Sequence, residues 1–460
     1  MSKSEYPGDI LAIHGGAPVR TEKFAPRWSF GDEEKAQLIE VMDRAPNEWR
    51  KGFKIREFTK GLQNIYGVRH VIASSSGTAS VHAALGALNP DPGQEVITTP
   101  VTDIGTLIGI LQHNLIPVFA DWDAHSFNTD PAEIERKITA RTCAILVVHL
   151  FGNPCDMDRI MEIASRRGIP VIEDCAQAHL ASVGGRMVGS IGDIGCFSLG
   201  LKTLTTDQGG FITVNNDDLA ARIRGFLSKG SVKTGDTWHP YSRLGAFYPM
   251  TDLQAAVGVA QLAKLEDATV AREKMAAIFD DAMGSLDGFT LPKRREDGRS
   301  VHYMYPFHLN EQTASVTLPE FLVALKAKGI VDGFGPYLKG RALYRYPILS
   351  KAQTYGRSGF PLRDESGIMR ADYTSLRLPH IERLLPSLGF FHMRNTFIER
   401  DTMDIARAIR KVARYYRSSD AALRPPAVEK FAAKSPSIQA PQPSEPRSRL
   451  MKFLRGKRKS

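Results

Sequence analysis

Three short segments carry side chains that could do chemistry together. The run "SSSGTAS" (74–80) lies between a β-like segment and a helical one, and amides and hydroxyls at the start of a helix suit a phosphate. In "PVIEDCAQAH" (170–179), an apolar strand ends in Glu173 and Asp174, where a carboxylate can hold a positively charged heterocyclic nitrogen. In "GCFSLGLKTLTTDQGG" (195–210), Lys202 is an isolated lysine in a loop rich in Thr and Gly. Taken singly, each has an ordinary explanation: a capped turn, a helix-capping acid and a solvated lysine.

Together the three segments supply the anchors that pyridoxal 5'-phosphate requires. The turn would bind the phosphate, Asp174 would keep the pyridine nitrogen protonated, and Lys202 would form a Schiff base with the aldehyde. A released Lys202 could then carry the proton between the substrate and the cofactor. We interpret His179 as a structural histidine. The cysteines and histidines lack the spacing of a zinc site, so we predict no metal.

The chain between residues 69 and 215 alternates β-rich runs with helical patterns. The expected strands are "HVIASS", "EVITTP", "IPVFADW", "CAILVVHLFG", "IPVIEDCA", "GCFSL" and "GFITVNN", several of them almost continuously apolar, as in strands covered on both faces. Helical patterns such as "TASVHAALGAL", "DIGTLIGILQHN" and "DMDRIMEIASRRG" separate the earlier runs. The alternation predicts an α/β fold with a mainly parallel, seven-stranded sheet and helices on both faces.

The pattern changes near residue 251. Residues 251–283 are expected to form one long helix capped by Thr251 or Asp252, and residues 285–418 mix strands and helices in a smaller α+β region. We therefore divide the chain into four parts. They are an N-terminal segment (1–30) near the small domain, a large cofactor-binding domain (31–270), a small C-terminal domain (271–418) and a disordered, Pro-rich basic tail (419–460).

The net charge of +10 resides largely in the tail. Residues 447–460 contain seven Lys and Arg and no acid, so the charge does not indicate a nucleic-acid partner for the folded part. A solvated tail is the simpler interpretation, and a weak contact with acidic lipid or another polyanion is the alternative. Four cysteines without CxxC pairing, no secretory signal and no apolar run of 18 residues favour the cytoplasm.

The motifs resemble those of the DegT/StrS-type sugar aminotransferases, which have the fold type I architecture of pyridoxal phosphate enzymes. The resemblance extends over roughly residues 11–416. It rests on "SSSGTAS", "GNPCDMDRIMEIA", "PVIEDCAQAH", "GDIGCFSLGLKTLTTDQGGFITVNN" and "YPMTDLQAAVGVAQL". It implies that Lys202 is the Schiff-base lysine and Asp174 the partner of the ring nitrogen. It also implies further cofactor contacts at Gly77, Thr78, Ala79, Gln177 and Ser198, and a homodimer whose subunits both line each active site.

Two departures from the family pattern concern the cofactor. The family usually has "P-x-x-T-F" after the second strand, whereas "PVTDIGT" places Asp103 and Ile104 there. Near residue 249 the family commonly has an Asn that reaches the neighbouring subunit's cofactor, and here Pro249 has no side-chain donor. Both departures concern how the cofactor would be held.

The resemblance implies amino transfer from glutamate or glutamine to a keto sugar, nucleotide-linked or free, or to a cyclitol. The first alternative is a pyridoxal phosphate-dependent sugar dehydratase. Some relatives carry histidine in place of the lysine and dehydrate, and the retained Lys202 favours amino transfer. The second is a degenerate, non-catalytic family member, which the changes at Asp103 and Pro249 motivate.

Overall fold

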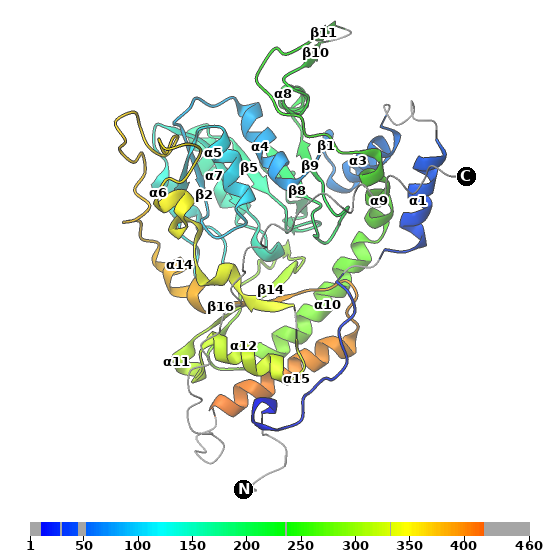
Figure 1. Cartoon of the computed structure of the whole chain (residues 1–460), viewed down its shortest axis with the longest axis vertical. Helices are drawn as coiled ribbons and strands as arrows, with labels where there is room; N and C mark the ends of the chain where they lie inside the picture. The colour runs from blue at the N-terminus through cyan, green and yellow to red at the C-terminus, as the bar shows by residue number, and fades with distance from the viewer. Residues whose placement is uncertain (1–10, 28–29, 45–51, 235–236, 332, 418–460) are drawn as a thin grey trace, which may run out of the picture. The chain divides into compact units, whose positions relative to one another are not determined.

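A seven-stranded sheet forms the centre of the larger part of the fold (Figure 1). The computed structural model describes residues 11–27, 30–44, 52–234, 237–331 and 333–417, so the predicted tail lies outside the described residues. The strand order is β1–β9–β8–β5–β4–β2–β3. The pairs from β8 to β3 are parallel, whereas β9 is antiparallel to both β1 and β8. All seven expected segments form strands, namely β1 (His70–Ser74), β2 (Glu95–Thr98), β3 (Ile116–Phe119), β4 (Thr142–Val148), β5 (Val171–Asp174), β8 (Ile194–Ser198) and β9 (Gly210–Val214).

Helices cover both faces of this sheet, which explains why its strands are apolar on both sides. In β4, Leu146 belongs to the core on one face, and its neighbours Ile145 and Val147 belong to the core on the other. The first face is covered by α4 (Gly77–Leu88), α5 (Gly105–Gln112) and α8 (Asp217–Leu227). The second is covered by α3 (Phe53–Tyr66), α6 (Pro131–Lys137) and α7 (Met157–Arg167). The fold class predicted from the sequence is thereby confirmed.

The helix expected over residues 251–283 is wrong in one respect, because it is two helices. Thr251 caps α9 (Asp252–Ala263) with a capping box, as predicted, and α10 (Leu265–Gly284) follows after Lys264. At this junction the Lys264 ammonium reaches the Glu34 carboxylate of α1 (Asp32–Asp43) at 2.8 Å. The apolar pattern continues across the junction, so periodicity alone did not indicate the break.

A second, antiparallel sheet forms the centre of the C-terminal part. It consists of β12 (Phe289–Thr290), β14 (Met304–Leu309), β16 (Leu388–His392) and β15 (Phe334–Pro336), in that spatial order. Its core includes residues of α10, α12 (Leu318–Ala327) and α15 (Glu399–Arg417), the helices beside it in Figure 1. The N-terminal segment packs here too, since Arg20 pairs with Asp401 and Asp404 of α15.

The chain between β15 and β16 returns to the large sheet. It contains α13 (Pro347–Ser350) and α14 (Pro379–Leu384), and its apolar side chains join the core on the α4 side. The carboxylate of Asp121, just after β3, accepts hydrogen bonds from the amides of His380 and Ile381 at the start of α14. Residues 271–418 therefore include a segment whose core contacts are with the large sheet. Small antiparallel pairings join β6 (Ser182–Val183) to β7 (Arg186–Met187) and β13 (Gly298–Arg299), and β10 (Val232–Thr234) to β11 (Thr237–His239).

Candidate active site

The turn after β1 forms the start of α4. Ser76 is the N-cap residue, and its hydroxyl accepts a hydrogen bond from the amide of Ala79 at 3.0 Å. Because the first amides of a helix have no acceptor within the helix, those of Gly77 and Thr78 are placed to bind a group outside it. The turn expected from the sequence is formed, and Ser76 already occupies the amide of Ala79.

The end of β8 approaches this turn closely. A Cβ atom added to Gly77 would lie 2.6 Å from Ser198 Cβ, so only glycine permits this approach. The hydroxyl of Ser198 accepts a hydrogen bond from the amide of Gly200 at 3.3 Å. Two of the three segments that the sequence analysis singled out therefore meet at Gly77 and Ser198.

His179 supports Ser198 from inside the protein. The imidazole is fully buried, its Nε2 donates to the Ser198 carbonyl at 2.9 Å, and it lies against Phe197 and Phe211. Burial, opposed by this hydrogen bond, lowers the pKa of His179 to about 4. A neutral, enclosed imidazole of this kind agrees with the interpretation of His179 as a structural residue.

Asp174 ends β5, beside Cys196 of β8 and Val148 of β4. Its carboxylate is almost completely buried and accepts hydrogen bonds from the Thr106 hydroxyl at 2.8 Å and the Ala176 amide at 3.1 Å. Burial raises the pKa of Asp174, while these hydrogen bonds and the charge of Lys202 act in the opposite direction. The site therefore holds a carboxylate that a further cation would stabilise.

Lys202 follows Leu201, which has a left-handed backbone conformation with φ of 53°. The Lys202 ammonium lies 4.8 Å from the centre of the Tyr303 ring, just before β14. Burial opposes ionisation of Tyr303, but Lys202 and Arg27 outweigh it and lower the pKa of the phenol. Lys202 thus contacts the Tyr303 ring, and its charge acts on both the Tyr303 phenol and the Asp174 carboxylate.

Gln177, three residues after Asp174, binds the backbone of the segment that follows β4. Its Oε1 accepts a hydrogen bond from the amide of Phe151 at 2.8 Å. The rings of Phe151 and Tyr337 lie edge to face, 4.7 Å apart. Burial raises the pKa of Tyr337, and the nearby Asp103 and Asp174 carboxylates add to this increase.

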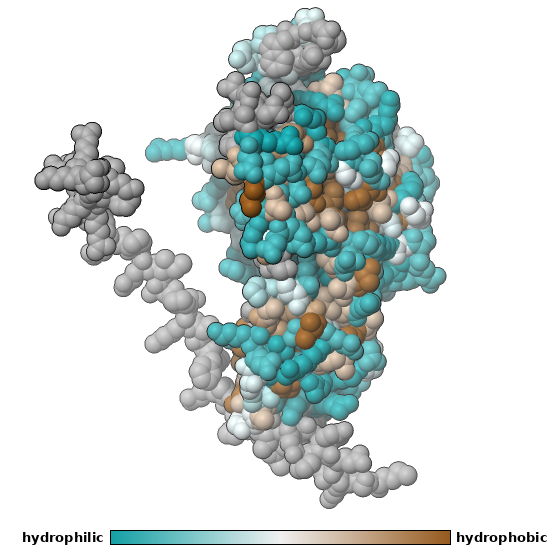
Figure 2. Space-filling model, turned by 90° about the vertical axis from the view of Figure 1, so that its right-hand side faces the viewer, coloured by the Kyte–Doolittle hydropathy of each residue, from teal (hydrophilic) through white to brown (hydrophobic). Residues whose placement is uncertain are grey.

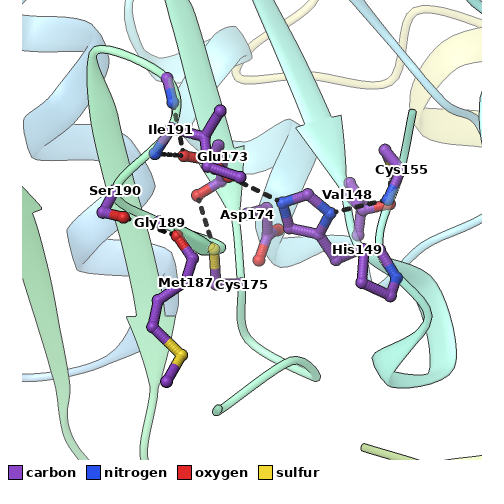
Figure 3. A network of polar contacts seen from close by, with 12 residues as sticks. Val148, His149, Cys155, Glu173, Asp174, Cys175, Met187, Gly189, Ser190 and Ile191 are labelled. Carbon is purple, nitrogen blue, oxygen red and sulfur yellow. Dashed lines mark hydrogen bonds and ion pairs between the residues drawn. The ribbon is translucent and has the colours of Figure 1, made fainter. Parts of the chain in front are cut away.

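Glu173, the second acid of the motif, points to the other side of the strand and into a separate network (Figure 3). Its carboxylate accepts hydrogen bonds from the amides of Ile191 and Gly192 and lies 3.1 Å from His149 Nε2. Nδ1 of His149 accepts a hydrogen bond from the Cys155 amide, so Nε2 carries the proton.

His149, Glu173 and Cys175 are the group that could hold a metal ion within the part of the chain that the structure describes. Both nitrogens of His149 are already engaged in hydrogen bonds, as described above. The network therefore serves to fix the end of β5.

The sequence analysis missed Thr106, Tyr303 and Tyr337. Thr106 lies on α5, whereas Tyr303 and Tyr337 come from the C-terminal part, more than 100 residues after Asp174. Their positions depend on how the antiparallel sheet packs near the large one, and no local pattern indicates that packing. Of the two departures, Asp103 is exposed and its carboxylate accepts the Gly105 amide, and Pro249 is exposed at the surface.

Residues 29–366 match the model of the DegT/DnrJ/EryC1/StrS aminotransferase family, and the chain belongs to this family. The aminotransferases of this family depend on pyridoxal phosphate, and this protein is a pyridoxal phosphate-dependent transaminase. The resemblance inferred from the motifs is confirmed, and so is the cofactor. None of the helices among the described residues is long and apolar enough to cross a membrane.

Named relatives include sugar and cyclitol aminotransferases. The chain is 37% identical to GDP-perosamine synthase of Caulobacter vibrioides over 356 residues, which cover 76% of this chain and 94% of that protein. It is 31% identical to L-glutamine:2-deoxy-scyllo-inosose aminotransferase of Streptoalloteichus tenebrarius over 438 residues, covering 88% and 98% of the two chains. The crystal structure of an aminotransferase from Psychrobacter cryohalolentis superposes with a TM-score of 0.74 at 26% identity, covering 86% and 100%.

The Gly77–Ser198 contact predicts the effect of a single methyl group. Gly77→Ala forces Ser198 away from the start of α4, and we expect a loss of about 1–3 kcal/mol in the free energy of unfolding, with weaker cofactor binding. Denaturant titration and cofactor titration measure the two effects. Gly284→Ala on α10 is the matched control, because an added Cβ there meets no atom within 4 Å. Equal behaviour of the two variants would contradict the close contact.

The buried histidines predict loss of stability in mild acid. Burial lowers the pKa of His179 to about 4 and, together with the Arg294 charge, that of His302 to about 3. Below pH 6.5 the unfolded chain therefore binds protons that the native protein does not. The free energy of unfolding should fall by roughly 1.4 kcal/mol per pH unit for each histidine until its native pKa is reached. Denaturation of His302→Asn between pH 7 and pH 5 should show a shallower decline than the parent, whereas substitution of the exposed His125 should leave the slope unchanged.

Proposed function

We propose that this protein transfers an amino group from glutamate or glutamine to a keto sugar, nucleotide-linked or free, or to a cyclitol. The observation that carries the proposal is the buried Asp174 carboxylate at the end of β5, which is close enough to Lys202 for the lysine charge to oppose the rise in pKa that burial causes. The sugar and cyclitol substrates in the names of the relatives support this class of acceptor.

The residues at the strand ends fit pyridoxal phosphate. Burial raises the pKa of Asp174 because it disfavours the charged carboxylate. The positive charge of a protonated ring nitrogen beside it would stabilise that carboxylate. Gly77, Thr78 and Ser198 would hold the phosphate, with Ala79 in the same first turn of α4, and Gln177 would lie beside the ring. When bound, the cofactor supplies an aldehyde that receives the amino group and a ring that withdraws electrons from the adjoining carbon.

Lys202 is the residue that would bond to the cofactor and move the proton. Its Nζ would carry a proton between the α-carbon of the bound substrate and the cofactor carbon that carries the amino nitrogen. Tyr303 would keep the ammonium in place, since the two groups interact directly. The Thr- and Gly-rich loop after Lys202 leaves room for this movement.

We further propose that the enzyme works as a homodimer in the cytoplasm. Hydrophobic side chains are exposed among hydrophilic ones on the face seen in Figure 2. Leu201, next to Lys202, is 44% exposed, and Leu253 of α9 is 40% exposed. Ile39 and Met42 of α1, which packs on α9, are exposed too. A second copy covering these side chains would close the site at Lys202. We also propose the division of the folded chain near residue 270 and, as the alternative to a solvated tail, a weak contact of the tail with acidic lipid or another polyanion.

Replacing Lys202 tests the covalent role. Lys202→Ala should leave the purified protein without the yellow absorbance that the wild type shows after addition of pyridoxal phosphate. Borohydride should fix the cofactor on the peptide containing Lys202 in the wild type but leave none attached in Lys202→Ala. Lys274→Ala, an exposed lysine of α10, is the control and should keep the colour. A colourless wild type would favour the non-catalytic alternative.

Product analysis tests the reaction. With a nucleotide-linked keto sugar or 2-deoxy-scyllo-inosose, the wild type should form the amino product only when glutamate or glutamine is present. One 2-oxo acid should appear per amine formed, because the amino group is transferred and not released. Mass spectrometry of acceptor and donor measures both products. Loss of water from the sugar without a donor would instead indicate the dehydratase alternative.

A further inference from the structure

Tyr303 is a buried phenol in contact with cations from two distant parts of the chain. Only 5% of the residue is exposed. The Lys202 ammonium lies 4.8 Å from the centre of its ring, and the Arg27 guanidinium lies 5.2 Å from the same point. Both distances are within the range in which an aromatic ring attracts a cation. The N-terminal segment, through Arg27, therefore reaches the ring that the lysine of the candidate site contacts.

A third cation, Arg272 of α10, is enclosed nearby. Its Nη1 donates to the hydroxyl of Thr203, the residue after Lys202, and its Nε and Nη2 have no hydrogen-bond partner among the residues that the structure describes. Burial and the charge of Arg27 lower the pKa of Arg272, and Tyr303 acts in the opposite direction. Buried cations are unfavourable unless an anion balances them, and the phenol of Tyr303 can become such an anion.

The charges around the ring favour the phenolate form of Tyr303. Burial opposes its ionisation, yet Lys202 and Arg27 together lower the pKa of the phenol. Tyr337 behaves differently, because burial raises its pKa and Tyr303 adds to the rise. His392 is kept neutral, because burial and the surrounding cations lower its pKa to about 3. Of these three titratable groups, Tyr303 is therefore the one suited to supply a negative charge.

Asp174 cannot balance the charge of Lys202 in the same way once the cofactor is bound. Under the proposed function its carboxylate faces the protonated ring nitrogen, so its own charge is already balanced. Lys202 becomes an ammonium when it takes a proton from the substrate, and this charge arises near Arg27 and Arg272. Repulsion from these two cations opposes the proton transfer. A phenolate at Tyr303 offsets the repulsion, because its negative charge lies beside the new ammonium.

We propose that Tyr303 works as a phenolate, held in that form by Arg27, and that it stabilises the ammonium which Lys202 forms during proton transfer. This inference rests on the proposed function, because it names a positioning residue for the base of the same reaction. Tyr303 gives its own proton to solvent beforehand and exchanges none during the reaction. The C–H bond of the substrate breaks, its electron pair passes into the cofactor ring, and its proton binds Lys202 Nζ. Lys202 then passes that proton to the cofactor carbon that carries the amino nitrogen.

Ultraviolet titration of the full-length protein before cofactor is added tests the phenolate without requiring turnover. Subtracting the spectrum of Tyr303→Phe from that of the wild type isolates the absorbance of this one phenolate. We expect its midpoint to lie below the value of about 10 for an unperturbed tyrosine. Arg27→Gln and Lys202→Met should each raise the midpoint, because each removes a cation beside the ring. Arg414→Gln, a change at an exposed arginine of α15, is the matched control and should leave the midpoint unchanged.

Exchange of the α-hydrogen of glutamate or glutamine for deuterium then measures the proton transfer itself. In the loaded enzyme without a ketone, exchange should decline toward acid, because a protonated Lys202 cannot accept a proton. Tyr303→Phe should move this decline to lower pH and reduce the plateau at higher pH by about 10-fold, since Lys202 without the phenolate is a weaker base. Damage to packing alone would lower the rate and leave the pH of the decline unchanged. Tyr355→Phe, which removes an exposed phenol, should behave as the wild type does.

Two results would overturn the inference. One is a Tyr303 midpoint at or above about 10 that neither Arg27→Gln nor Lys202→Met moves. The other is a decline of exchange at the same pH in Tyr303→Phe and in the wild type. If Tyr303→Phe does not fold, the difference between wild type and Arg27→Gln still shows whether one phenolate has moved.

The two measurements also separate this inference from the proposed function. A wild type that transfers amino groups without a lowered Tyr303 midpoint would overturn the inference and leave the proposed function standing. A lowered midpoint that depends on Lys202, in a wild type that stays colourless with pyridoxal phosphate, would refute the proposed function and leave the charge pair standing.

Discussion

The site depends on keeping one carboxylate, that of Asp174, inside the protein at the end of a parallel strand. A buried carboxylate is stable only where donors and cations meet it. Thr106 of α5 and the Ala176 amide supply the donors, and Lys202 supplies a charge. Glu173, one residue earlier, points the other way and is saturated by His149 and two backbone amides. The two adjacent acids therefore have different tasks, because successive side chains of a strand face opposite sides of the sheet.

The loop that carries Lys202 is held by the C-terminal part of the chain. Arg272 of α10 binds the hydroxyl of Thr203, and Asn395 after β16 binds its carbonyl. Tyr303, just before β14, lies beside the lysine itself. A change in the position of α10 or of the antiparallel sheet would therefore change the surroundings of Lys202 directly.

The large sheet could be predicted from the sequence, and the boundary of the site could not. Strands such as β4 are continuous apolar runs, and Asp174 and Lys202 lie on or just after such strands, so local patterns place them correctly. Arg272, Tyr303 and Tyr337 lie in segments whose local pattern indicates only helix, strand or loop. Their positions near the strand ends arise from packing against residues far away in the chain. The break between α9 and α10 at Lys264 could not be predicted either, because the apolar pattern continues across it.

The change from an aromatic residue to Asp103 does not leave this side of the site without an aromatic ring. Tyr337 is buried there and is close enough to Asp103 and Asp174 for both carboxylates to add to the rise in its pKa that burial causes. Phe151 packs edge to face against it, and Gln177 also holds the Phe151 amide. The ring comes from the segment after β15, which returns from the antiparallel sheet to the large one. Tyr337 belongs to the same core cluster as the helices on this face of the large sheet, so core contacts hold its ring next to Phe151. The departure at Asp103 is thus accompanied by an aromatic residue supplied from elsewhere, which argues for a working cofactor site over a degenerate one.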